Sequence, residues 1–350
     1  MLAENRSRPR LPLPISELLH VLGPAFGIGL FVLTPKAYWW RLRRGRSPLA
    51  QTFYERRRIL PRASLDSRKL SHELYLRPTP YCDSHAPEVV ILADAFRQRA
   101  SSDWEYAQAI YDFVRNDIVY ALEPMTGLQV VTTLKAGCGG CLDKLNVFVA
   151  LARAGGIPTR YCTVGNVAPL ESGKERPRLE VMNRYLKALE VEGDWSLKKL
   201  GASFSRLVQR LEKKVQAGNS FEMRFHPMAE LKIGDFWIPA DVTWGDAEAA
   251  AQNLPLPRFG YDPLTLRRYR GSVVSRSEQA PIGRSYWLVR CVLCLLARGL
   301  VDHLNHTVEG LRAQGRQMLA EMGQDEYVRR QRRFYVPVPG AAQLGLSLRA

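Results

Sequence analysis

The chain has 350 residues, 46% of them hydrophobic, and a formal net charge of +16. This composition excludes a disordered chain, because it can bury a full core in one elaborated domain or two small ones. The basic excess predicts attraction to an acidic partner, and charge alone does not choose between nucleic acid, anionic lipid and acidic protein. Six cysteines without a dense pattern indicate a reducing compartment, so we predict a cytoplasmic protein rather than a disulfide scaffold.

Residues 1–84 are predicted to form an apolar segment followed by a basic linker. The apolar run Leu18–Leu33 is interrupted by a proline and glycines, and it is shorter than the roughly 20 residues that a spanning helix needs. Two interpretations stay open: an arm packed on the domain, or association with an anionic membrane surface, aided by the aromatic and basic run Lys36–Arg46. Nucleic-acid binding is not favoured, because no zinc finger or similar motif accompanies the arginines of residues 41–69.

The first helices of the folded part are predicted between Pro87 and Tyr120. Apolar residues recur there at helical spacing and would share one buried face. The residues of that face are Ala107, Ile110, Tyr111 and Val114. The apolar run Ile118–Tyr120 then ends this part of the chain.

The next predicted element is a buried helix that begins at Cys141 and ends before Gly155, Gly156 and Pro158. A thiol at a helix N-terminus lies at the positive end of the macrodipole, which favours the thiolate and therefore a nucleophile. Glycines just before it would let the backbone and a substrate approach closely. The alternative is a buried structural cysteine, because cysteine is among the most buried residue types.

Two basic amphipathic helices are predicted at Leu179–Leu189 and Leu197–Val215, either as surface helices or as a lid or docking arm. After them, a hairpin is predicted around the turn Gly234-Asp235, with His226 at its start and Asp241 at its end.

Antiparallel pairing returns the chain, so His226 and Asp241 are expected within hydrogen-bonding reach at one edge of a sheet. With Cys141 they would form a triad. In such a triad the imidazole accepts the thiol proton, the carboxylate fixes the tautomer of the ring, and the thiolate attacks a carbonyl.

Beyond Trp244 we predict an irregular proline-rich link and then helices. A strongly apolar helix is expected over Ser285–His306 and a charged helix over Glu309–Arg333, with a loose tail from Tyr335.

Two Cys-x-x-Cys pairs raise the question of a metal site. The pair Cys291 and Cys294 lies in an apolar helical run without the glycine turn of a zinc knuckle, so it is not favoured as a partner for Cys138 and Cys141. We predict no metal and no cofactor.

Four motifs resemble the transglutaminase-like superfamily, whose members share a papain-like core and a Cys-His-Asp triad. They are Gly-x-Cys-x-Asp-Lys at residues 139–144, the Ala-Leu-x-Arg-Ala-x-Gly-Ile-Pro-x-Arg run after it, His-x-x-Ala-Glu from His226, and Trp-x-Pro-x-Asp-x-Thr around Asp241. The resemblance covers roughly residues 85–250 and implies Cys141 as nucleophile, His226 as base and Asp241 as its orienter. The family's spacing from the nucleophile to Gly-Ile-Pro selects Cys141 over Cys138.

The resemblance implies an α+β fold with a transglutaminase-like (papain-like) core. The nucleophile helix would pack on an antiparallel sheet that carries the histidine and the aspartate. We divide the chain into residues 1–84, a domain at 85–255 and a helical C-terminal extension at 256–350. The stretch from Cys141 to His226 is longer than is usual in the family, so a helical insertion is expected at about 169–221. A second departure is Pro227, which restricts His226 to extended backbone.

The resemblance implies thiol-dependent amide-bond chemistry through a thioester on Cys141, by a peptidase, an amidase or an acyl transferase. The alternative is a non-catalytic binding or scaffold module that uses the basic surface. A basic insertion would repel a protonated lysine and attract an acidic peptide. We therefore expect hydrolysis of a peptide or protein amide that carries carboxylates, rather than transfer to an amine.

Overall fold

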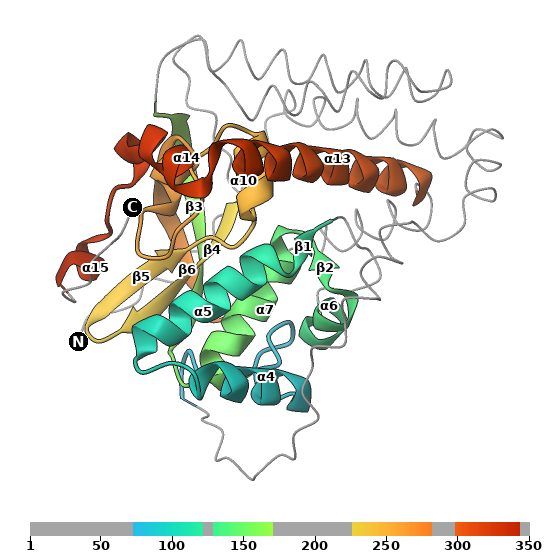
Figure 1. Ribbon diagram of the computed structural model, residues 1–350. Coiled ribbons are helices and arrows are strands. Elements are labelled where there is room, and N and C mark those ends of the chain that lie inside the picture. The colour runs from blue at the N-terminus through green and yellow to red at the C-terminus, as the bar shows by residue number, and fades with distance from the viewer. Residues whose placement is uncertain (1–72, 122–128, 171–225, 282–297, 344–350) are drawn as a thin grey trace, which may run out of the picture.

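The computed structural model describes residues 73–121, 129–170, 226–281 and 298–343 (Figure 1). Several predictions fall outside these ranges: the apolar segment and basic linker up to residue 72, the helical insertion from residue 171, and the Cys291–Cys294 pair. They stay predictions.

Four helices precede and surround the proposed nucleophile. They are α4 (Pro87–Arg97), α5 (Asp103–Asn116), α6 (Val130–Ala136) and α7 (Cys141–Ala154). A proline in the first turn starts α4, and the Ser102 side chain caps α5 by accepting a hydrogen bond from the Glu105 N–H. The predicted apolar face of α5 is buried, so the leading helices are confirmed.

Helix α7 is central, in contact with α4, α5, α6, β3 and β4 (Figure 1). Every residue after its first is buried, which confirms the predicted buried helix. Its buried polar groups have partners, as they must away from water. The Tyr161 hydroxyl donates to Asn146 Oδ1 at 3.0 Å, and Arg153 Nη2 donates to the Thr159 carbonyl at 2.9 Å.

The main sheet is antiparallel, with strand order β5-β4-β3-β6. Its strands are β3 (Thr159–Pro169), β4 (His226–Ile233), β5 (Phe236–Ala240) and β6 (Tyr269–Ser277). Strands β4 and β5 form the predicted hairpin, with Gly234 in the left-handed region at φ 58°. A parallel pair, β1 (Val119–Tyr120) and β2 (Cys138–Gly139), lies beside the start of α7.

The C-terminal region is built into the same fold. Besides β6, which pairs with β3 and was not predicted, it contains α10 (Asp246–Ala251), α11 (Pro263–Leu266), α13 (Arg298–Met322), α14 (Gln324–Arg330), a 3-10 turn (Arg332–Phe334) and α15 (Pro339–Gln343). The predicted charged helix is divided, because Gly323 adopts a φ of 81° between α13 and α14.

The expectation of a loose tail from Tyr335 is wrong for the residues described. Tyr335, Val338 and Ala341 are buried, and the Val338 N–H donates to the Gly260 carbonyl at 2.9 Å. Apolar side chains at this spacing cover the open side of the sheet near β5, so burial holds the tail in place.

Helix α13 is docked on α10 at very short range (Figure 1). A methyl group at Gly315 would lie 1.8 Å from the Ala247 carbonyl oxygen, so only glycine permits this approach. Nearby, Arg312 Nε donates to Glu248 at 2.9 Å and Arg312 Nη2 donates to the Tyr120 carbonyl at 3.0 Å. The C-terminal helix is thereby tied to the strand that pairs with β2.

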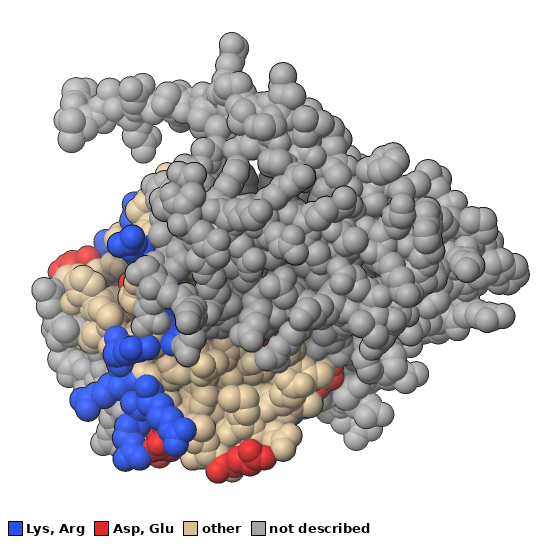
Figure 2. All heavy atoms as spheres, turned by 90° about the horizontal axis from the view of Figure 1, so that it is seen from above, with Lys and Arg blue, Asp and Glu red and all other residues tan. Residues whose placement is uncertain are grey.

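The arrangement as a whole confirms the predicted α+β class, with helix α7 packed on an antiparallel sheet. Within the described ranges no helix has both the length and the apolar character to cross a bilayer. Seen from above, the Lys and Arg side chains of the described surface gather mainly along one side of it (Figure 2).

Candidate active site

Cys141 is the first residue of α7, as the sequence indicated. The turn before it depends on two glycines. Gly137 ends α6 in the left-handed region at φ 58°, and a Cβ at Gly139 would lie 2.5 Å from the Asp143 Cβ. Asp143 accepts a hydrogen bond from the Gly140 N–H at 2.8 Å and so caps the start of the helix.

Cys138 occupies a different environment. It lies on β2 and is buried with Val119 and Ala121 in a small apolar cluster. Cys141 is only partly buried, whereas Cys138 and Cys162 are fully enclosed. Of the cysteines described, Cys141 is therefore the accessible one.

His226 and Asp241 meet at the open end of the hairpin. His226 Nε2 lies 2.7 Å from Asp241 Oδ2, and both side chains are buried. His226 pairs with Val164 at the start of β4, and Asp241 directly follows β5. The hairpin thus brings together the two residues that the sequence suggested as base and orienter.

Asp241 has three hydrogen bonds and one ion pair. Its Oδ1 accepts from the Thr243 N–H at 3.0 Å and from the Thr243 hydroxyl at 2.7 Å, while Oδ2 bonds to His226 Nε2 and forms an ion pair with the Arg267 Nε. Burial alone would raise the pKa of Asp241. The Arg267 charge, His226 and Thr243 overcome that effect and hold this pKa well below its usual range. Asp241 is therefore a fixed carboxylate.

The ionisation of Asp241 determines the tautomer of His226. A carboxylate only accepts hydrogen bonds, so Nε2 must carry the proton in the bond to Asp241. In the neutral ring the lone pair is then on Nδ1, which is the atom that would accept a proton from a thiol.

The resting state of Cys141 differs from the expectation of a stabilised thiolate. Burial raises the pKa of the Cys141 thiol, and the negative charges of Asp143 and Asp241 raise it further, while the Leu142 N–H and Arg267 lower it. The helix N-terminus alone therefore does not lower this pKa below its ordinary value. The same charges show that Cys141 shares the electrostatic environment of Asp241 and Arg267.

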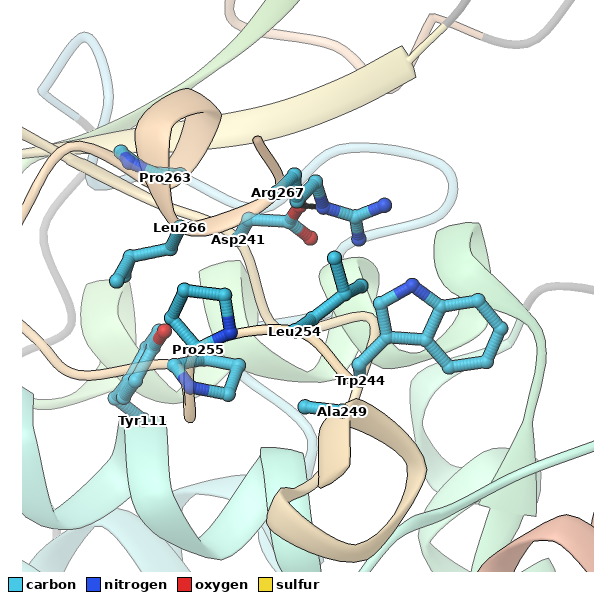
Figure 3. Close-up of a pocket in the computed structure, with 10 residues that line it drawn as sticks. Tyr111, Asp241, Trp244, Ala249, Leu254, Pro255, Pro263, Leu266 and Arg267 are labelled. Carbon is cyan, nitrogen blue, oxygen red and sulfur yellow. Dashed lines mark ion pairs between the residues drawn. The ribbon is translucent and has the colours of Figure 1, made fainter. Parts of the chain in front are cut away.

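Arg267 is the residue of this site that the sequence analysis missed. It follows α11, outside the region of family resemblance, and it is 7% exposed. Figure 3 shows Arg267 and Asp241 directed at each other at the wall of a small pocket of about 20 Å³, room for one water molecule. No sequence pattern links residue 267 to Asp241, because only the folded chain brings them together.

Two other carboxylates of this region, Glu230 and Asp246, are each paired with two arginines. Glu230 accepts from Arg160 at 2.7 Å and from Arg276 at 2.8 Å across the sheet. Asp246 accepts from Arg115 at 2.7 Å and from Arg258 at 3.0 Å. The contact with the His226 ring described here is made by Asp241, whose role as orienter stays a prediction.

In the part of the chain that the structure describes, no three His, Cys, Asp or Glu side chains lie together in a way that could hold a metal ion.

Comparison with known proteins agrees with this arrangement. The sequence model of the transglutaminase-like superfamily matches residues 91–242, which include Cys141, His226 and Asp241. No curated protein matches the chain.

One solved structure is similar, that of a “putative cysteine protease” from Cytophaga hutchinsonii, with 19% sequence identity and a TM-score of 0.34. The match covers 59% of this chain and 46% of that protein, so the chain spans less than half of its length.

Proposed function

Because residues 91–242 belong to the transglutaminase-like superfamily, we propose that this protein is a thiol-dependent enzyme that acts on amide bonds. Cys141 is the nucleophile, His226 the general base and Asp241 the residue that orients His226. The observation that carries the proposal is the buried 2.7 Å contact between His226 Nε2 and an Asp241 carboxylate whose other oxygen is filled by Thr243.

The proposed reaction begins with transfer of the Cys141 proton to His226 Nδ1. The sulfur then attacks the carbonyl carbon of the amide and forms a tetrahedral intermediate. In this proposal the Cys141 N–H, one of the first-turn amides of α7 with no acceptor inside the helix, stabilises the oxyanion. The proton on His226 passes to the leaving amine, and the C–N bond breaks. A thioester remains on Cys141.

Water or an amine can resolve the thioester, and we propose water. An acyl transferase needs a second pocket that excludes water and holds a neutral amine. The basic character of the whole chain, with its formal charge of +16, favours an acidic peptide or protein substrate over a protonated lysine. We also propose that the protein acts in the cytoplasm and that this acidic substrate is the anionic partner that the basic composition predicts.

A second candidate is a non-catalytic binding module of the same fold. The observation in its favour is the raised pKa of the Cys141 thiol, because a thiol without an effective base is inert at neutral pH. The two candidates differ in whether Cys141 ever carries an acyl group.

The test is incubation with a glutamine-containing peptide library and a labelled primary amine, with intact-protein mass spectrometry to detect the thioester. We expect acylation of Cys141, followed by release of free acid faster than incorporation of the amine. Amine incorporation that outpaces acid release would replace the hydrolase with a transferase. No acylation of any cysteine would leave the binding module.

Two variants make the test specific for the nucleophile. Cys141→Ala should abolish acylation, whereas Cys138→Ala, which changes the neighbouring buried thiol on β2, should retain it. Loss of acylation in Cys138→Ala with retention in Cys141→Ala would reverse the assignment.

A further inference from the structure

Two side chains that can carry positive charge share one oxygen of Asp241. His226 Nε2 lies 2.7 Å from Oδ2, and the Arg267 Nε contacts the same atom. The other oxygen is already filled by two bonds from Thr243. The carboxylate therefore cannot rotate to give each cation an oxygen of its own.

The fold fixes Arg267 in this position. The one-turn helix α11 begins with a bond from the Leu264 N–H to the Asp262 carboxylate at 2.9 Å, and the Thr265 hydroxyl donates to the Phe334 carbonyl at 3.0 Å. Arg268 then adopts a left-handed φ of 58°, an uncommon conformation for a residue with a side chain. This turn, held from both sides, directs Arg267 inward and leads into β6.

The surroundings of the pair are apolar. Leu254, Leu266 and prolines line the small pocket beside Asp241 and Arg267 (Figure 3). Charges interact more strongly where water is excluded, so the Arg267 charge acts on its neighbours with little screening.

We propose that Arg267 is a positioning residue that holds Asp241 in line with His226 and keeps the His226 ring in its neutral, proton-accepting form. A protonated ring would place a second cation against the guanidinium across one oxygen, and that repulsion disfavours the imidazolium. This role rests on the proposed function, in which a neutral ring must take the proton of Cys141.

Other ionisable groups face the same place, and none of them duplicates this contact. Asp143 and Lys144 lie on α7, Tyr111 on α5 and Cys162 on β3, and each interacts with Cys141 or Asp241 through charge. Lys144 donates to the Arg115 carbonyl at 2.9 Å, and Asp143 caps the start of α7. Among the described residues, Arg267 is the cation paired directly with Asp241 besides His226.

The consequence concerns activity in mild acid. General-base catalysis needs the neutral ring, so the pH at which the ring takes up a proton sets the lower limit of activity. With Arg267 present this limit lies at a lower pH than the Asp241–His226 pair alone would give.

The test is a titration of the His226 ring by nuclear magnetic resonance in protein with labelled histidine, with its signal assigned by its loss in His226→Gln. Removing a contacting charge shifts a titration by roughly 1 pH unit or more, so Arg267→Gln should raise the midpoint by at least about that amount. Arg267→Lys, which keeps the charge, should restore most of the original midpoint. Equal midpoints in the wild type and Arg267→Gln would overturn the proposal.

A second comparison keeps the test valid if Arg267→Gln does not fold. The ring should titrate at a lower pH in Asp241→Asn than in the double variant Asp241→Asn with Arg267→Gln, because only the first retains the guanidinium. Equal titration in these two proteins would also overturn the proposal. None of these titrations needs substrate. Absence of acylation in the wild type would refute the proposed function, whereas the titrations would still decide whether Arg267 keeps the His226 ring neutral.

Discussion

Asp241 contacts both His226 and the buried Arg267, so the proposed triad gives it two tasks, to orient His226 and to neutralise Arg267. Asp241→Asn should slow acyl transfer by roughly 10⁴-fold, since the amide no longer fixes the tautomer of the ring. The same change leaves the Arg267 guanidinium without a charge partner, so we also expect a loss of about 3–5 kcal/mol of unfolding free energy.

Urea unfolding and single-turnover rates measure these two effects separately. Asp241→Asn combined with Arg267→Gln is the control for stability, because it removes both charges together and should recover part of the lost free energy. Normal turnover in Asp241→Asn would contradict the assignment of the orienter.

Lys144 is a buried amine three residues after Cys141, and it makes stability depend on pH. Burial lowers the pKa of Lys144 to about 7, aided by Arg115 and Arg312 and opposed by Glu248. In the unfolded chain the pKa is roughly 10.4. Between these values the unfolded chain binds more protons, so this residue makes the unfolding free energy rise with pH across that window.

Lys144→Met removes this titration. The unfolding free energy of the wild type, minus that of Lys144→Met, should increase from about pH 7 to about pH 9. Urea unfolding at both pH values measures the difference, in which the titration of other groups cancels. A difference that is independent of pH would show that Lys144 keeps an ordinary pKa.

At the scale of elements, the close contact of α13 with α10 allows a matched pair of substitutions on one helix. Gly315→Ala would place a methyl group 1.8 Å from the Ala247 carbonyl oxygen, whereas at Gly310 nothing lies within 4 Å of the added methyl group. We expect Gly315→Ala to destabilise the protein by several kcal/mol. Gly310→Ala should be neutral or stabilising by up to about 1 kcal/mol, the gain in helix propensity.

Thermal unfolding of both variants checks this expectation. Helix α10 begins five residues after Asp241, so Gly315→Ala should also lower the acylation rate of Cys141. Equal stability of the two alanine variants would mean that α13 does not dock on α10 in this way.

For the whole molecule, the sequence sufficed for the parts in which local pattern and tertiary structure agree. The apolar spacing after Cys141 predicted α7, and Gly234-Asp235 predicted the hairpin that joins His226 to Asp241. The leading helices followed from the buried face of α5. Each of these elements is formed by neighbours in the chain, and therefore its pattern is local.

The parts that the sequence did not reveal depend on contacts between distant segments. Strand β6 has mostly exposed side chains and so lacks the alternation of a half-buried strand, yet its backbone completes the sheet. Arg267 reaches Asp241 only after α11 and β6 are in place. The raised pKa of Cys141 likewise arises from burial and from Asp241, which a helix-terminus argument does not include.

The most direct test of the catalytic assignment is the rate of alkylation of each cysteine by iodoacetamide near neutral pH, followed by mass spectrometry, in the wild type and in His226→Ala. Burial raises the pKa of Cys82 to about 11 and that of Cys162 to about 12, so these two thiols are internal controls. We expect Cys141 to react at least about tenfold faster than either, and His226→Ala to remove most of that advantage, because the base is lost. Labelling of Cys141 that is no faster than that of Cys162, or that is unchanged in His226→Ala, would contradict the triad.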